Sequence, residues 1–503
     1  MKKTKNKKNK KNLFFKITSY LLIISAIVAT IFLIYFGILP TSYLALIIIG
    51  GGLLIFLLFK LLNNRKLRKW IKIVVSIPSI LLIVLFTLVC FYSYGTIDFF
   101  NDIFDVGIRH DEYSVYVLKD SGYNDIKDLK DKIIAVSDKK EDVTKKAIDK
   151  VANKIEFNEA DYDTITDALD SVIDNDTDAV IALNSNVDIV KEDTDAYNNL
   201  KAIYTFTVTS KVKTLASKVD VSKDNFVIYI SGIDTNGKVS AKARSDVNII
   251  LAVNPREKKI LMVNTPRDYY VMLHSKKAMD KLTHAGVYGI EESVGTLEDL
   301  YDIKVDYYAR VNFTTFVNIV EKLGGIEVDV PVNFCEQTSS RTSSAQICLK
   351  KGVQTLNGEQ ALALARTRHT LSGGDRARGG NQMLVLESII NKVISPSIIV
   401  KYNSLLSSVS DSVLTNVDQK TITKLIKKQI KNNTSWEIES YAVDGSDSSN
   451  VTYSTGRSNA YVMLPKEETV TEAKIKLDKI LGTKKYTSTT TTITSTTTKS
   501  RKV

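Results

Sequence analysis

The stretch FVIYISGIDTNGKVSAKARSDVNIILAVNPREKKILMVNTPRD, residues 226–268, contains three apolar runs separated by polar residues. The runs at 226–230, 247–253 and 259–263 are short, and residues with a high preference for strands are frequent in them. We therefore expect three strands in this stretch. Polar and charged residues follow or precede each run, so these side chains are predicted to gather at strand ends.

Helical patterns follow this stretch toward the C-terminus. They cover residues 290–301 and 313–323, and the second is preceded by Asn312 as a possible N-cap and closed by Gly324 and Gly325. Further helices are expected at about 418–431 and 468–481. Because strands and helices alternate, the sequence predicts a layered α/β core.

A second, smaller α/β unit is expected upstream, between residues 114 and 183. Strand patterns at 115–118, 133–136 and 179–183 alternate with helical ones, including a helix at 141–152. The unit resembles one lobe of an extracytoplasmic solute-binding protein. Since no charged or aromatic cluster accompanies the resemblance, we interpret the unit as a spacer or docking module.

Three apolar segments at about 17–39, 43–59 and 73–94 precede both units. Each is close to the ~20 residues that cross the hydrocarbon core of a membrane. A cleaved signal peptide is the alternative for the first, but its apolar run is longer than such peptides have, and two more segments follow. We expect three spanning helices.

The formal charge of +12 is concentrated around these segments. Residues 1–72 contain 14 of the 68 lysines and arginines and no acid, which leaves 54 basic against 56 acidic residues in the remainder. This distribution indicates membrane topology and argues against a nucleic-acid-binding domain. By the positive-inside rule, the N-terminus and residues 65–69 are cytoplasmic, and everything after about residue 95 lies outside.

Cys335 and Cys348 flank a polar loop in the part predicted to lie outside the cell. A disulfide there would contribute roughly 3 kcal/mol of stability. Two free thiols are the alternative. Cys90 lies in the third apolar segment and is interpreted as a small hydrophobic residue.

Two acids stand at the ends of the predicted strands. Asp234 follows the first run, and Asp246 precedes the second. Ligands bind at strand ends in open α/β sheets, and Mg²⁺ takes one or two carboxylates together with water and phosphate oxygens. The two aspartates are therefore candidates for one cation site. Asp234 alone would be interpreted as a turn residue.

The segment ALARTRHTLSGGDRARGGNQ, residues 363–382, concentrates basic charge. Arg366 and Arg368, two positions apart, would face the same side of an extended segment and could bind phosphate oxygens. A solvated basic loop is the alternative. Buried arginines without a counter-charge cost several kcal/mol each, so the cluster is either exposed or binds an anion. Its charged members are Arg366, Arg368, Asp375, Arg376 and Arg378.

At these residues a resemblance becomes specific. The block at about 225–390, a third of the chain, resembles the LytR-CpsA-Psr family of cell-wall ligases through the ordered motifs D-T, R-S-D, T-P-R-D, R-T-R, G-G-D-x-x-R and Q. Three N-terminal spans and an accessory domain resemble the capsule-linked branch. The resemblance implies an α-β-α sandwich with an apolar tunnel for a polyprenyl chain. It also implies transfer of a glycopolymer from polyprenyl pyrophosphate to peptidoglycan.

The resemblance also assigns roles to residues. Asp234 and Asp246 match metal-associated aspartates, with Mg²⁺ or Mn²⁺ as the implied cofactor, and Asp375 matches the acid of the last motif. Lys281 and Arg376 are further candidates, and Asn381 departs from the arginine that many members carry. The positions that match pyrophosphate contacts are Arg244, Arg267, Arg366, Arg368, Arg378 and Gln382.

The implied chemistry is phosphoryl transfer at the outer face of a bacterial cell membrane. Asp246 is the first candidate for the base that accepts the proton of the acceptor hydroxyl, and Asp234 is the alternative. The expected partners are a polyprenyl-pyrophosphate-linked glycan, peptidoglycan and the membrane, with no nucleic acid. Two other functions remain open, namely a polyprenyl-pyrophosphate phosphatase and a non-catalytic lipid sensor that attenuates transcription.

The expected organisation has four parts. Residues 1–96 form the basic tail and three spans, 97–221 the accessory α/β domain, 222–482 the catalytic domain with C-terminal helices, and 483–503 a Thr-rich disordered tail.

Overall fold

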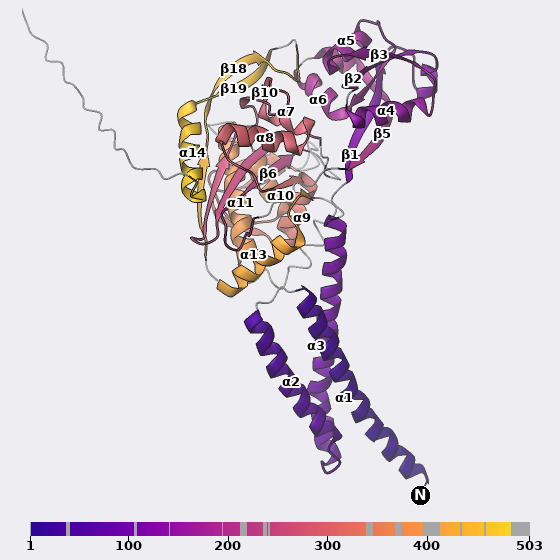
Figure 1. Ribbon diagram of the computed structural model, residues 1–503, viewed down its shortest axis with the longest axis vertical. Helices are drawn as coiled ribbons and strands as arrows, with labels where there is room; N and C mark the ends of the chain where they lie inside the picture. The colour runs from indigo at the N-terminus through magenta and orange to yellow at the C-terminus, as the bar shows by residue number, and fades with distance from the viewer. Residues whose placement is uncertain are drawn as a thin grey trace, which may run out of the picture.

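In the computed structural model, a bundle of three long helices lies at one end of the molecule and two α/β domains lie at the other (Figure 1). The domains are called here the smaller domain, from 108 to 211, and the larger domain, from 219 to 483. The structure describes residues 2–36, 41–104, 108–139, 141–193, 195–211, 219–234, 239, 242–338, 346–367, 375–395, 413–432, 435–456 and 459–483. The expected Thr-rich tail from residue 484 onward lies outside the described residues.

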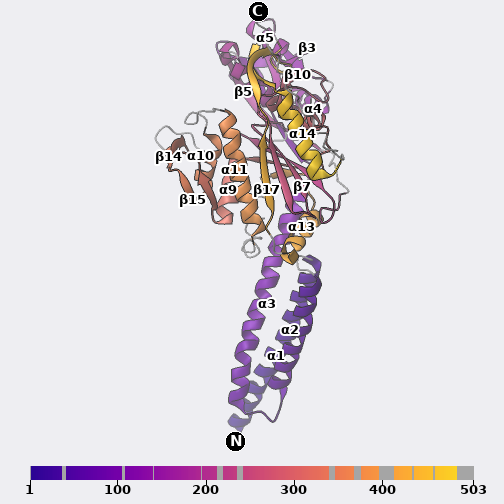
Figure 2. The same cartoon turned by 90° about the vertical axis from the view of Figure 1, so that its left-hand side faces the viewer.

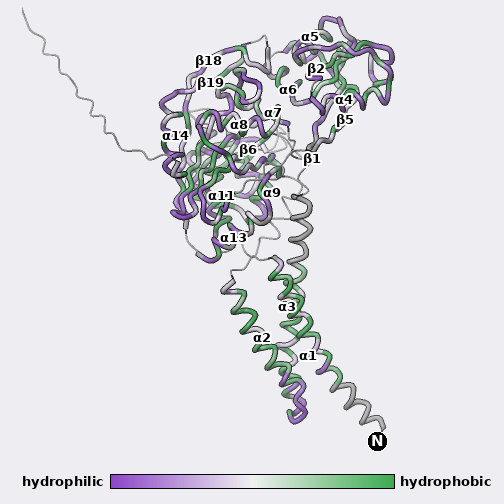
Figure 3. Tube along the Cα trace, in the orientation of Figure 1, coloured by the Kyte–Doolittle hydropathy of each residue, from purple (hydrophilic) through white to green (hydrophobic). Residues whose placement is uncertain are grey.

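The bundle consists of α1 (Lys2–Phe36), α2 (Thr41–Asn63) and α3 (Lys69–Phe104). Within the described residues, three 23-residue windows in these helices are long and apolar enough to cross a membrane, which agrees with the three predicted spans. Their apolar side chains face outward, as with Leu46 and Phe91, which are 73% and 74% exposed. Figure 3 shows this apolar stretch of the bundle in green. Helix α3 runs past the end of its window at Phe91 without a break as far as Phe104.

The smaller domain has a mixed five-stranded sheet in the order β3-β2-β4-β1-β5, within the residues described. The predicted strands at 115–118, 133–136 and 179–183 and the helix at 141–152 are confirmed as β1, β2, β4 and α4. Strands β3 and β5 were not predicted, because polar residues occupy much of both. The elements are β1 (Ile108–Leu118), β2 (Ile133–Ser137), α4 (Asp142–Ala152), β3 (Asn158–Tyr162), α5 (Ile165–Ile173), β4 (Ala179–Leu183), α6 (Asn184–Asp193) and β5 (Leu200–Lys211).

The larger domain is built on a sheet in the order β16-β11-β6-β7-β8-β17, as far as the described residues show. The three predicted strands are its centre: β6 pairs antiparallel with β7, and β7 antiparallel with β8. The strands are β6 (Phe226–Ile233), β7 (Val247–Asn254), β8 (Lys259–Asn264), β11 (Tyr307–Asn312), β16 (Val413–Thr415) and β17 (Glu437–Ala442).

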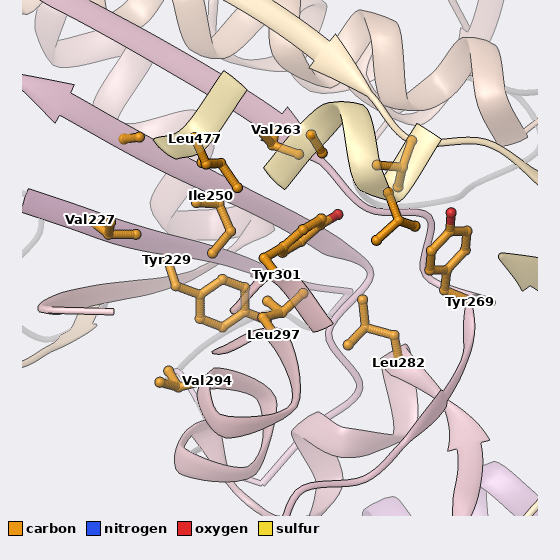
Figure 4. Packing of buried hydrophobic residues seen from close by; sticks show 14 of the residues in the cluster. Val227, Tyr229, Ile250, Val263, Tyr269, Leu282, Val294, Leu297, Tyr301 and Leu477 are labelled. Atoms are coloured by element: carbon orange, nitrogen blue, oxygen red, sulfur yellow. The ribbon is translucent and has the colours of Figure 1, made fainter. Parts of the chain in front are cut away.

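Helices cover both faces of this sheet, so the predicted α-β-α sandwich is confirmed (Figure 2). Ile250 and Ala252 of β7 pack with α8 and α14 on one face, and Figure 4 shows this core around Tyr301. Ile249 and Leu251 pack with α11 and α13 on the other. The alternation follows from the two-residue period of strands. The helices are α7 (Leu282–Tyr288), α8 (Ile290–Tyr301), α9 (Phe313–Leu323), α10 (Gly358–Arg366), α11 (Asp375–Ile394), α13 (Gln419–Asn432) and α14 (Glu467–Leu481).

Helix α9 begins and ends as predicted. The Asn312 side chain accepts a hydrogen bond from the Thr315 N–H, and Gly324 takes the left-handed conformation (φ 77°) at the C-terminal end. Short strand pairs lie outside the main sheet. They are β9 (Tyr270–Met272) with β10 (Met279–Lys281), β12 (Ile326–Val330) with β15 (Gly352–Leu356), β13 (Phe334–Gln337) with β14 (Gln346–Leu349), and β18 (Gly445–Val451) with β19 (Asn459–Pro465).

Candidate functional site

A cavity of about 540 Å³ lies between the ends of β6, β7 and β11 and the helices α9, α10 and α11. Most of its lining is apolar, including Phe316, Ile319, Leu386 and Ile389. Charged and amide side chains predicted from the sequence also line it. These are Asp234, Arg244, Asp246, Arg267, Arg366, Arg378 and Gln382.

The two predicted acids meet because β6 and β7 are neighbours. Asp234 follows the last residue of β6, Asp246 precedes the first residue of β7, and the Asp246 N–H donates to the Gly232 carbonyl at 2.8 Å. Gly232 is required for this close pairing, because a Cβ there would lie 2.7 Å from a methyl group of Val247. Residues twelve positions apart in sequence are thus brought to one wall of the cavity.

Asp246 is held by two side chains. Arg267 Nη1 lies 2.6 Å from its Oδ1, and the Thr283 hydroxyl donates to the same oxygen at 3.3 Å. Thr283 is fully buried and also fixes the backbone, since its N–H donates to the Arg267 carbonyl and its carbonyl accepts from the Ser245 N–H. Sequence reasoning missed Thr283, because a single threonine beside a helix start carries no motif.

Arg310 stabilises the same wall of the cavity through buried hydrogen bonds. This β11 residue is fully buried, and its guanidinium donates to the Ser231 hydroxyl at 3.1 Å, the Ser245 hydroxyl at 2.9 Å and the Gly286 carbonyl at 3.5 Å. A Cβ at Gly286 would lie 2.4 Å from the Ala243 carbonyl oxygen, so glycine is required there. Arg310 was also missed, although an arginine inside an apolar strand was a visible signal.

Arg244 lies between Ala243 and Ser245 in the chain, and it lines the cavity. Desolvation by burial lowers the pKa of its guanidinium, and the nearby Asp246 carboxylate opposes that shift. A cation that has lost much of its water interacts more strongly with an anion than a solvated one does. The cavity wall at Arg244 therefore favours an anionic ligand.

Arg366 corrects one expectation from the sequence. It is the last residue of helix α10 and does not lie in an extended segment, because a capping box between Asn357 and Gln360 starts the helix and an alanine-rich run continues it. Its guanidinium lies 4.8 Å from the ring centre of Phe313, and Nη1 donates to the Thr338 carbonyl at 3.4 Å. Arg368, the other member of the predicted pair, lies outside the described residues.

Arg378 and Gln382 line the cavity from one face of α11, four residues apart. Between them, Gly379 allows the helix to approach β8, because a Cβ there would lie 2.3 Å from the Asn264 amide nitrogen. Asn381, the position that departs from the family pattern, is buried and donates to the Leu364 carbonyl at 3.2 Å. It joins α11 to α10 and does not line the cavity.

Three other candidates are placed differently. Arg376 forms an ion pair with Asp444 at 2.5 Å, and Lys281 is a buried residue at the start of α7; neither lines the cavity. Lys466 and the neighbouring groups, Arg376 among them, lower the pKa of Asp444 to about 2. Asp375 begins α11, and its side chain lies outside the described part of the chain.

Cys335 and Cys348 are joined by a disulfide across the β13–β14 pair. The next residue, Glu336, lines the cavity, so this hairpin forms part of its border. His284 pairs with buried Asp280 at 2.7 Å.

Comparison with known proteins shows that this chain is similar to named transferases. The chain is 38% identical over 205 residues to the polyisoprenyl-teichoic acid–peptidoglycan teichoic acid transferase TagT of Bacillus subtilis strain 168, covering 40% of this chain and 63% of TagT. It is 36% identical over 234 residues to TagV of the same organism, which carries the corresponding transferase name, covering 46% of this chain and 59% of TagV. The crystal structure of B. subtilis TagV matches with a TM-score of 0.44 and 31% identity, covering 52% of this chain and 98% of that one.

The alignments thus span less than two thirds of the length of these two curated relatives. The family model covers more of the chain than either alignment. The LytR_cpsA_psr family model matches residues 183–478, more than half of the chain, and so this protein belongs to the LytR-CpsA-Psr family.

Proposed function

We propose that this protein is a membrane-anchored phosphotransferase that moves a glycopolymer from polyprenyl pyrophosphate to peptidoglycan. The cavity supports this proposal most directly, because apolar walls and several arginines meet in one space of about 540 Å³. A lipid pyrophosphate has the same two parts. The names of TagT and TagV describe transfer of teichoic acid from a polyisoprenyl carrier to peptidoglycan, the same class of reaction.

The lining suggests how such a substrate lies. The polyprenyl chain packs against the apolar side chains of α9 and α11, such as Phe316 and Ile389. The pyrophosphate then meets the guanidinium groups of Arg244, Arg366 and Arg378, which can each donate two hydrogen bonds to phosphate oxygens.

Asp234 and Asp246 would hold a divalent cation, Mg²⁺ or Mn²⁺. The two carboxylates line one cavity. That donor set fits a cation that completes its shell with water and substrate phosphate, as Mg²⁺ does. Such a cation, when bound, supplies positive charge that stabilises the phosphoryl oxygens.

In the proposed reaction, the oxygen of an acceptor hydroxyl on peptidoglycan forms a bond to the phosphorus that carries the glycan. The bond between that phosphorus and the bridging oxygen breaks, and polyprenyl phosphate leaves with the electron pair. Asp246 accepts the proton of the hydroxyl, while Arg267 and Thr283 fix the orientation of its carboxylate. The cavity arginines neutralise charge on the leaving phosphate.

Replacing Arg366 with alanine is expected to abolish attachment of glycopolymer without unfolding the protein. Its guanidinium lines the cavity, where it contacts the Phe313 ring and the Thr338 carbonyl. The measurement is the amount of polymer covalently attached to purified wall. Arg376→Ala is the matched control, because it removes an arginine of the same cluster that pairs with Asp444. Full attachment by the Arg366 variant would refute the site.

Replacing Thr283 with valine is expected to lower kcat about tenfold, the effect of losing roughly one hydrogen bond to the base. Valine keeps the shape of the side chain and removes the hydroxyl that contacts Asp246. KM is expected to change little, and Thr283→Ser is expected to restore the rate. An equal loss in the serine and valine variants would show that the hydroxyl does not act through Asp246.

A phosphatase is the second candidate, because water could replace the acceptor hydroxyl in the same cavity. Incubating the full chain with a lipid-linked glycan, with and without peptidoglycan, separates the two functions. A transferase yields wall-linked glycan, whereas a phosphatase releases free glycan phosphate at the same rate in both cases. Bound lipid that is never consumed would instead indicate the sensor.

The proposed location is the bacterial cell membrane, with the N-terminus in the cytoplasm. The basic residues at the N-terminal end of α1 and in the α2–α3 connection support this orientation. Three spans then place both α/β domains on the outer side, where peptidoglycan is built.

A further inference from the structure

The smaller domain contacts the larger domain beside the cavity. Figure 1 shows it against the end of the larger domain that carries α7, and α6 packs on α7. Val287 of α7 is 1% exposed and belongs to the apolar core of the smaller domain. The two domains therefore share packed surface, which is more than a flexible spacer provides.

An ion pair crosses this interface. Lys242 of the larger domain is 7% exposed, and its Nζ lies 2.8 Å from Oε2 of Glu141, the N-cap residue of α4 in the smaller domain. A buried ammonium group needs a counter-charge. Here the other domain provides that charge.

Lys242 also begins the segment that forms one wall of the cavity. Arg244 follows two residues later and Asp246 four residues later, and both line the cavity. Backbone hydrogen bonds fix the segment on its other side, from Ala243 N–H to the Gly286 carbonyl and from Ser245 N–H to the Thr283 carbonyl. Lys242 is therefore connected to Arg244 through a short piece of chain whose backbone is bonded to α7.

A second acid of the smaller domain acts on the same wall. Desolvation raises the pKa of Asp188 on α6, and the positive charge of Arg244 opposes this shift. The same attraction counteracts part of the desolvation of Arg244. The electrostatic environment of this cavity arginine thus depends on both domains.

We propose that the smaller domain is part of the anion-binding apparatus: its Glu141 holds Lys242, and Lys242 positions Arg244 and Asp246. Lys242 is a positioning residue, and the ligand of the cavity is taken from the proposed function. Without Glu141, the ammonium group of Lys242 moves toward water and takes the segment at 242–246 with it.

The test uses the full chain in detergent and the variant Glu141→Gln. Binding of farnesyl pyrophosphate is measured by calorimetry, and amide exchange is followed at residues 243–246. We expect binding about tenfold weaker or worse, since small displacements of positioned groups are costly, together with faster exchange at 243–246. The exchanged-charge variant Glu141→Lys with Lys242→Glu is expected to restore both. Lys139→Met, which removes an ion pair with Glu159 wholly inside the smaller domain, is expected to change neither.

Two results would overturn the proposal. One is unchanged exchange and binding in Glu141→Gln. The other is faster exchange throughout the smaller domain with residues 243–246 unaffected, which would show a purely structural role. Neither readout requires turnover, and the exchange readout requires no ligand. A wild-type chain that binds farnesyl pyrophosphate but transfers no glycopolymer would contradict the proposed function and leave this proposal intact.

Discussion

Replacing Asp246 with asparagine is expected to lower the rate of glycopolymer transfer by about 10²–10⁴-fold, the usual contribution of a general base. Asparagine keeps an oxygen that can accept from Arg267 and Thr283, so the wall of the cavity is retained. It cannot accept a proton or provide a carboxylate to a cation. Transfer to purified wall by the full chain, with saturating donor, measures the effect.

Asp268→Asn is the matched control for this variant. Asp268 lies 3.6 Å from the same arginine, and its side chain is 14% exposed against 13% for Asp246, but it does not line the cavity. Its replacement is expected to leave most of the transfer activity. If both variants lose activity equally, the effect comes from Arg267, and the assignment of Asp246 as the base is wrong.

Replacing Arg310 with methionine is expected to lower the stability of the larger domain by about 3 kcal/mol, because three buried groups lose a donor at once. The corresponding fall in Tm is roughly 6 °C for a domain of this size. Trp436, which packs in the core between the sheet and α13, provides a fluorescence signal for the transition.

Arg256→Met is the control for the stability measurement. The Arg256 side chain is 72% exposed and pairs with Asp224 at 3.7 Å on the surface, where ion pairs contribute about 0–1 kcal/mol. Its Tm is expected to stay close to that of the wild type. Equal Tm values for the Arg310 and Arg256 variants would show that the buried guanidinium network does not hold this wall together.

Local patterns predicted much of the fold. The α9 helix has its predicted ends, because an asparagine that accepts from the third residue and a glycine with positive φ are local signals. Strands β6, β7 and β8 were predicted by their apolar runs. Strand β5 was not, because it alternates polar residues and obtains its partner, β1, from ninety residues away.

The residues of the candidate site also fall into two groups: those that local patterns predicted and those that they did not. Charged residues with recognisable spacing, such as Asp246 and Arg378, were named from the sequence and line the cavity. Arg376 lies in the same basic segment as Arg378, but it pairs with Asp444, a residue far away in the sequence, and so does not line the cavity. Thr283 and Arg310 act through hydrogen bonds to residues far away in the sequence, which no local pattern indicates.

The unbroken course of α3 has a consequence for the lipid carrier. The helix continues for the 13 residues between Phe91 and Phe104, a rise of about 20 Å beyond the apolar window. In the proposed orientation, this stiff part of α3 would set the distance between the bilayer and the two α/β domains. The isoprenoid tail of the proposed substrate would then have to leave the bilayer in part, so that its diphosphate reaches the arginines of the cavity. Contact with the apolar walls of the cavity would compensate for the free energy of that extraction.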